Sequence, residues 1–123
     1  MILQLDFSSD VPIYLQLRNQ IVIGIGSGQL KQGDRLPTVR TLAEESGINV
    51  MTVSKAYNLL KQEGYIITDR RKGAVVAVQT GAPAIKEETI HALRLHLHEL
   101  RLGGMTKTEL HDLVEKLYEE VEA

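Results

Sequence analysis

An alanine, a glycine and a valine at fixed spacing constrain the fold of this chain more than any other feature. Gly47 follows Ala43 by four residues, and Val53 follows Gly47 by six. A small side chain at Ala43 lets a second helix approach closely, and a glycine accepts the positive φ that a tight turn between two helices favours. Val53 would close the small core between them. The spacing therefore predicts a helix-turn-helix whose second helix projects from the surface at a size that fits the DNA major groove.

Helix and strand signals surround this motif in a consistent order. Thr38 and Asn49 can cap the two helices of the motif, and Ser9 or Asp10 can cap an earlier one that starts near Pro12. We expect, in order, an extended arm (1–10), a helix ending near 26–28, a loop (30–37), helices over 39–46 and 50–63, and strands over 65–68 and 74–78 around a five-residue basic tip. The predicted fold class is mainly α with a small β-hairpin, a winged helix-turn-helix over residues 1–79 followed by a two-helix tail over 84–123.

The tail is expected to be the dimerisation domain. A linker (80–83) precedes a helix predicted over 84–102, and a capping box, Thr106 with Glu109, opens a last helix that ends near residue 122. A lone pair of amphipathic helices cannot bury both apolar faces, so we expect a second copy to complete a small bundle. The alternative is that the tail packs on its own DNA-binding domain. The expected interface residues are Ile90, Leu93, Leu97, Leu100, Leu110, Leu113 and Leu117.

Charge is distributed unevenly along the chain. The net charge is −2, yet residues 11–78 carry nine Lys and Arg against five Asp and Glu, whereas residues 79–123 carry five against nine. The chain is thus a basic module with an acidic tail. The sequence has no cysteine, no signal-peptide pattern and no apolar run of about 20 residues. We therefore expect a cytoplasmic protein without disulfides, thiolate metal sites or a membrane segment.

Residues 33–43, GDRLPTVRTLA, resemble the G-x-x-L-P-S-x-R-x-L-A segment of the GntR family of bacterial regulators. The run NVMTVSKAY at 49–57 continues the match in register, and PIYLQL at 12–17 and Arg71-Lys72-Gly73 also fit, so the match covers residues 11–78. The short tail and Ala56-Tyr57 are similar to the YtrA subfamily, whose members lack large effector domains. The resemblance implies a winged helix-turn-helix repressor that binds a pseudo-palindromic operator in double-stranded DNA as a homodimer.

The resemblance also implies where DNA would be contacted. Arg40 would meet a phosphate or a base edge, within a matched segment that also holds Arg35 and Thr38. The expected contacts of the recognition helix are Asn49, Val50, Met51, Thr52 and Ser54, with Lys55 close by. The expected contacts of the wing are Arg70, Arg71, Lys72 and Gly73, which would reach phosphates and the minor groove.

Four residues depart from the family pattern at three places. Thr41 replaces a common Glu, which removes one partner of a capping box, and Arg71 occupies a wing position often held by Gly. Val50 and Met51 replace Pro and Asn. Apolar side chains cannot donate hydrogen bonds to guanine but suit thymine methyl groups. We therefore expect an inner half-site that leans toward A and T.

Other readings of the sequence stay open beside DNA binding. The basic tip could be an ordinary solvated turn, and the chain could be a protein-interaction module. Such a module predicts no steep salt dependence of DNA binding. An enzyme is disfavoured, because the chain offers no nucleophile or acid–base set, and the glycines at 24–28 follow a helix rather than a strand. His91 and His98 share a helix face, but no third ligand converges on them, so we expect no metal and no cofactor. An unidentified small-molecule effector is left open, although the tail has little room for a pocket of roughly 300 Å³.

Overall fold

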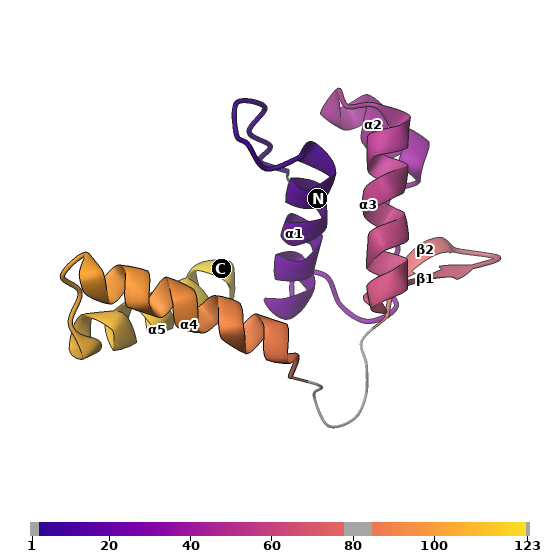
Figure 1. The fold of residues 1–123 in the computed structure, drawn as a ribbon. Coiled ribbons are helices and arrows are strands. Elements are labelled where there is room, and N and C mark those ends of the chain that lie inside the picture. Colours follow the sequence, from indigo (N-terminus) through magenta and orange to yellow (C-terminus); the bar gives the residue numbers. More distant parts are fainter. Residues whose placement is uncertain (1–2, 78–84, 123) are drawn as a thin grey trace. The chain divides into compact units, whose positions relative to one another are not determined.

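The computed structural model describes residues 3–77 and 85–122, and the chain divides into two compact units, Met1–Gln79 and Thr80–Ala123. The first unit contains α1 (Ile13–Gly26), α2 (Val39–Ser46), α3 (Val50–Glu63) and the antiparallel strands β1 (Ile66–Asp69) and β2 (Gly73–Val76) (Figure 1). The second contains α4 (Glu87–Leu102) and α5 (Lys107–Glu122). This mainly helical architecture with one hairpin confirms the predicted fold class. The linker predicted at 80–83 lies outside the described residues.

The core of the first unit lies where α1 and α3 run side by side and α2 meets α3 (Figure 1). Val53, Ala56, Tyr57 and Leu60 form the inward face of α3, as its helical period predicts, and at most 2% of each residue is exposed. Leu17 and Ile21 of α1 pack against them. The full core comprises Leu17, Ile21, Leu36, Leu42, Ala43, Val53, Ala56, Tyr57, Leu60, Ile66 and Val76. Burial of this inner face of α3 leaves its other face for contacts outside the unit.

Side-chain caps set the two helices of the motif at their predicted positions. Thr38 Oγ1 accepts a hydrogen bond from Thr41 N at 3.1 Å and donates one to Thr41 Oγ1 at 2.8 Å. Gly47 ends α2 with φ 68°, in the left-handed region that its lack of a Cβ permits. Asn49 Oδ1 then accepts a 2.7 Å hydrogen bond from Met51 N and starts α3. The turn that orients α3 is therefore specified by local hydrogen bonds.

The start of α1 differs from the prediction. Pro12 precedes the helix and no side chain caps it, because Ser9 Oγ instead accepts a hydrogen bond from Val11 N at 3.1 Å, in the turn before the helix. Two glutamines of α1 fix the preceding arm: Gln16 Oε1 accepts from Asp6 N at 2.8 Å, and Gln20 Oε1 accepts from Gln4 N at 2.8 Å. The arm is thus held along the side of α1 and supplies no capping side chain to this helix.

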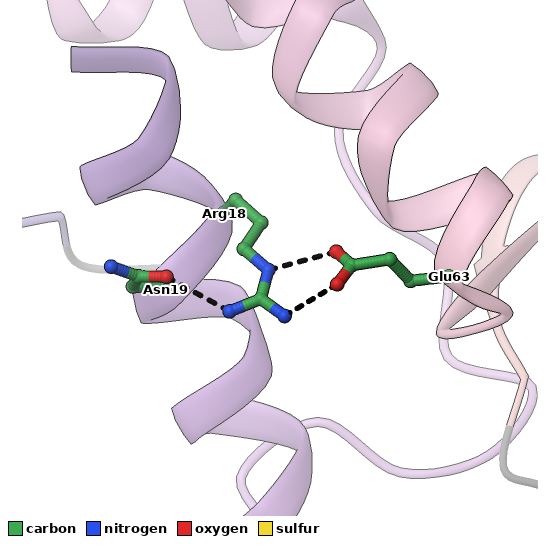
Figure 2. A network of polar contacts seen from close by, with 3 residues as sticks. All are labelled: Arg18, Asn19 and Glu63. Atoms are coloured by element: carbon green, nitrogen blue, oxygen red, sulfur yellow. Dashed lines mark hydrogen bonds and ion pairs between the residues drawn. The ribbon is translucent and has the colours of Figure 1, made fainter. Parts of the chain in front are cut away.

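A bidentate ion pair joins α1 to the end of α3 (Figure 2). Arg18 Nε and Nη2 donate to the two carboxylate oxygens of Glu63 at 2.8 and 2.7 Å, and Nη1 donates to Asn19 Oδ1 at 2.9 Å. The hydrogen bonds that Arg18 donates to Glu63 raise the pKa of the Arg18 guanidinium. Two parallel charge-assisted bonds are stronger and more directional than a single contact. Because both side chains are mostly shielded from water, with 22% and 18% of their surface exposed, this pair fixes the orientation of the two long helices.

The segment before α2 is more regular than the loop predicted for residues 30–37. Arg35 forms an antiparallel bridge with Val75. Gly33 N donates to Val76 O and Leu36 N donates to Ala74 O, both at 2.9 Å. The rest of this segment has no regular secondary structure, as predicted, and the single bridge was missed because so short a pairing shows no alternation in the sequence. The bridge lays Arg35 against the hairpin.

Candidate nucleic-acid interface

The first turn of α3 is exposed. Met51 has 74% and Val50 has 47% of its surface accessible. Asn49 is also exposed, while Thr52 and Ser54 are half-buried. Val50 and Met51 thus lie on the surface, as their expected contact with DNA requires. The leading turn of α3 is therefore open to solvent.

Lys55 lies one turn further along α3 and contacts α1. Its ammonium nitrogen is 4.0 Å from the centroid of the Tyr14 ring, a distance at which a cation is attracted to the face of an aromatic ring. The lysine remains exposed, so it can still face a phosphate while the ring restricts its position. No sequence signal pointed to this pair, because the two residues are on different helices.

Asn58 is an exposed polar residue that the sequence analysis overlooked. It follows Met51 by seven residues and Lys55 by three, and these steps place all three side chains on one helix face. A search for exposed positions at helical spacing from Met51 would have found it.

Arg40 is the second residue of α2 and is exposed. Thr38 and Arg35, on the segment leading into α2, are exposed as well. Within residues 3–77 and 85–119, the only Arg or Lys that forms an ion pair at or below 4.0 Å is Arg18, with Glu63. The guanidinium group of Arg40 thus has no such partner among these residues, whereas the charge of Arg35 helps to lower the pKa of Asp69.

The hairpin ends in three consecutive exposed cations, Arg70, Arg71 and Lys72. Asp69 Oδ1 orders this tip by accepting hydrogen bonds from Arg71 N at 2.7 Å and Lys72 N at 3.1 Å. These two hydrogen bonds, of which the one from Arg71 has the larger effect, hold the pKa of the Asp69 carboxyl below its ordinary value of 3.8. Gly73, paired with Asp69 across the hairpin, takes the left-handed φ of 80°. Arg71 has no positive φ, so its side chain causes no backbone strain at the tip.

The expected tail contacts are divided between exposed and half-buried residues. Ile90, Leu93, Leu100 and Leu117 have 40%, 51%, 36% and 51% of their surface exposed, whereas Leu97, Leu110 and Leu113 are half-buried. Leu97, Leu100, Met105 and Leu110 line a hollow of 510 Å³ where α4 and α5 join. The capping box is formed as predicted, with Thr106 N donating to Glu109 Oε1 at 3.0 Å and Glu109 N donating to Thr106 Oγ1 at 3.2 Å.

Two other classes of site have no counterpart in the described part of the chain. No three His, Asp or Glu side chains among these residues are placed to hold a metal ion, and His96 Nδ1 instead pairs with Glu99 Oε1 at 2.8 Å. Within the same residues, every helix is too short or too polar to cross a lipid bilayer.

Comparisons with known proteins converge on one group of regulators. Residues 13–76 match the family model described as bacterial regulatory proteins, gntR family. The transcriptional repressor YtrA of Bacillus subtilis is 32% identical over 97% of this chain and 94% of its own length. The regulator Rv1152 of Mycobacterium tuberculosis is 37% identical over 61% of this chain, and the match covers 62% of Rv1152. Both relatives are named as regulators of transcription rather than as enzymes.

Solved structures agree with this result. A transcriptional antiterminator from Listeria monocytogenes superposes with a TM-score of 0.79 at 28% identity, covering 100% of this chain and 94% of its own. YtrA from Sulfolobus acidocaldarius, a GntR-family transcription factor, gives 0.65 at 35% identity over 83% of this chain and 99% of its own. The DNA-binding domain of AraR in complex with an operator gives 0.55 at 25% identity over 61% of this chain and 96% of its own. The chain thus belongs to the GntR family and is a DNA-binding transcription regulator with a winged helix-turn-helix fold.

Proposed function

We propose that the protein represses transcription by binding a pseudo-palindromic operator as a homodimer, with residues 1–79 holding DNA and residues 84–123 joining the two copies. The observation that carries this proposal is the exposed leading turn of α3. In the same unit, the exposed cations on α2 and at the hairpin tip form no ion pair with any residue that the structure describes. The name of YtrA as a repressor and the operator complex of AraR support it. Tight binding to an operator would exclude RNA polymerase from the promoter.

In this proposal, three segments divide the work of recognition. The start of α3 lies in the major groove, where side chains reach base edges, and the hairpin follows the backbone into the minor groove. Arg40 binds a phosphate or a base edge from α2. The proposed contacts are Arg35, Thr38, Arg40, Asn49, Val50, Met51, Thr52, Ser54, Lys55, Arg70, Arg71, Lys72 and Gly73.

The tail supports the dimer through its exposed apolar surface. None of the residues of α4 is buried, and Leu93, Leu95 and Leu102 have 51%, 57% and 89% of their surface exposed. Exposed apolar side chains gathered on one helix are typical of interfaces, and a two-fold axis would let the same surface cover itself in the second copy. Two-fold symmetry would place the recognition helices about 34–36 Å apart, one turn of duplex.

The salt dependence of DNA binding tests the proposal. If Arg40, Arg71 and Lys72 of each copy neutralise one phosphate each, the logarithm of the association constant should fall with the logarithm of salt concentration at a slope of about −5. Fluorescence anisotropy on a site selected from random DNA measures the slope. The double variant Arg71→Ala/Lys72→Ala should flatten it by about 4, whereas Lys107→Ala/Lys116→Ala, the same charge change in the tail, should leave it unchanged. A flat slope in the parent protein would instead identify a protein-interaction module.

A second prediction concerns Asp69, whose carboxylate orders the backbone of the hairpin tip. The pKa of its carboxyl is depressed in the folded chain, so its stabilisation of the tip is present above pH 3.8 and is lost as pH falls through the folded value. Asp69→Ala and Asp69→Asn remove the same negative charge, but only asparagine keeps an oxygen that accepts from the tip amides. We therefore expect Asp69→Asn to bind DNA roughly fivefold more tightly than Asp69→Ala. Equal affinities would mean that the tip does not need this turn, and amide-proton shifts of Arg71 and Lys72 across an acid titration would show the same loss directly.

A further inference from the structure

Val50 and Met51 form an apolar tip on α3 that the phosphate contacts do not explain. The backbone beneath the tip is fixed, because Asn49 Oδ1 accepts from Met51 N at 2.7 Å. The next turn is anchored by Val53, which is 0% exposed. A rigid helix end thus presents two side chains that neither donate nor accept strong hydrogen bonds.

The surroundings of the tip are polar. Asn49 and Lys55 are exposed on either side of it along α3, and Thr52 and Ser54 are half-buried beside it. The core does not use the two apolar side chains, since Met51 has 74% and Val50 has 47% of its surface accessible. A partner that complements this turn would offer a small apolar group bordered by polar groups. In the DNA major groove, that group is the methyl on C5 of a pyrimidine.

We propose that Met51, supported by Val50, determines sequence specificity by packing on a pyrimidine C5-methyl group in each half-site. This inference rests on the proposed function and adds to it the chemical group that α3 reads. Thymine carries this methyl group by nature, and 5-methylcytosine carries it at the same ring position. Methionine suits the task because its unbranched, polarisable side chain adapts to a small apolar target. Burying one methyl group is expected to tighten binding about fourfold, and two half-sites together about fifteenfold.

Replacing thymine by uracil tests the inference, because this change removes the methyl group and keeps base pairing. The full chain is first used to select a binding site from random DNA, and each thymine of that site is then replaced singly. At one or two thymines in each half-site, the affinity should fall about fourfold for the parent protein. Met51→Ala should lose this sensitivity and should fold normally by circular dichroism, because its side chain is exposed. Ile23→Ala, a matched control at an α1 position that is 54% exposed, should keep it.

A second arm separates the two sources of the methyl group. Cytosine is placed at the sensitive position and compared with 5-methylcytosine, and methylation should restore binding about fourfold in the parent but not in Met51→Ala. Uracil-containing sites that bind as tightly as the parent site at every position would overturn the inference, as would a Met51→Ala variant that keeps the full sensitivity. A lack of gain on methylation of cytosine would overturn it too. Failure to select any site would instead reject the proposed function, so the two failures are distinguishable.

Discussion

Replacing Leu93 by aspartate is expected to convert the dimer into a monomer and to lower operator affinity about a hundredfold or more. Leu93 has 51% of its surface exposed in the single chain, on a helix with no buried residue. A carboxylate at this position would have to lose its water in an apolar interface, which is strongly unfavourable. A monomer holds one half-site, so binding loses the effective concentration that links the two halves.

Sedimentation velocity measures the change in mass, and DNA titration measures the change in affinity. Thr108→Asp is the matched control, since it adds the same charge at an exposed position of α5 and should leave both quantities unchanged. Leu117→Asp, at a position of α5 that is 51% exposed, should repeat the effect of Leu93→Asp. Leu97→Asp should also give monomers. Because Leu97 lines the hollow between α4 and α5, this change would also loosen the packing of these two helices. Unchanged sedimentation of Leu93→Asp and Leu117→Asp would contradict the proposed interface.

The parts of the fold that local signals determine could be predicted from the sequence. Thr38 and Asn49 cap their helices through bonds to amides two or three residues away, and such bonds depend on adjacent residues alone. The inward positions of α3 follow from its helical period, and their burial is complete. The exposed tip of α3 followed from the same period, which is why Val50 and Met51 could be assigned to the surface.

Contacts between distant segments could not be predicted in this way. The Arg18–Glu63 pair spans 45 residues, and neither residue shows a local pattern that names the other. The same holds for Lys55 over the Tyr14 ring and for the bridge from Arg35 to Val75. These contacts depend on how α1 and the hairpin pack against the rest of the unit, which is a property of the assembled core.

In the tail, the helical period predicts only part of the exposed apolar surface. The helical period of α4 selects a stripe through Leu93 and Leu97, yet Leu95 and Leu102 are even more exposed than Leu93. These two leucines are seven residues apart and share a second face of the helix. In a bundle of two copies, α4 would pack against α5 of its own chain and against a helix of the other copy. Such a helix needs two apolar faces.

Arg40→Ala should weaken operator binding by about 1–3 kcal/mol for each half-site, which is roughly fivefold to 150-fold. Arg40 is exposed near the start of α2 and has no ion pair within the described residues, so its removal takes no contact from the fold. Thermal unfolding and sedimentation should therefore match those of the parent. Lys61→Ala is the matched control, because it removes the same charge from an exposed position in the last turn of α3 and should change the affinity little.

The way in which binding weakens identifies what Arg40 touches. If the guanidinium binds a phosphate, affinity falls by the same factor on every DNA sequence, and the salt slope flattens by about 1 for each copy. If it binds a base edge, the loss is confined to the selected site and the preference at one base pair disappears. Arg40→Lys separates the two further, because lysine keeps the charge for a phosphate but cannot form the paired, planar bonds that guanine accepts. An Arg40→Ala variant that binds its operator as tightly as the parent would show that α2 does not contact DNA through this residue.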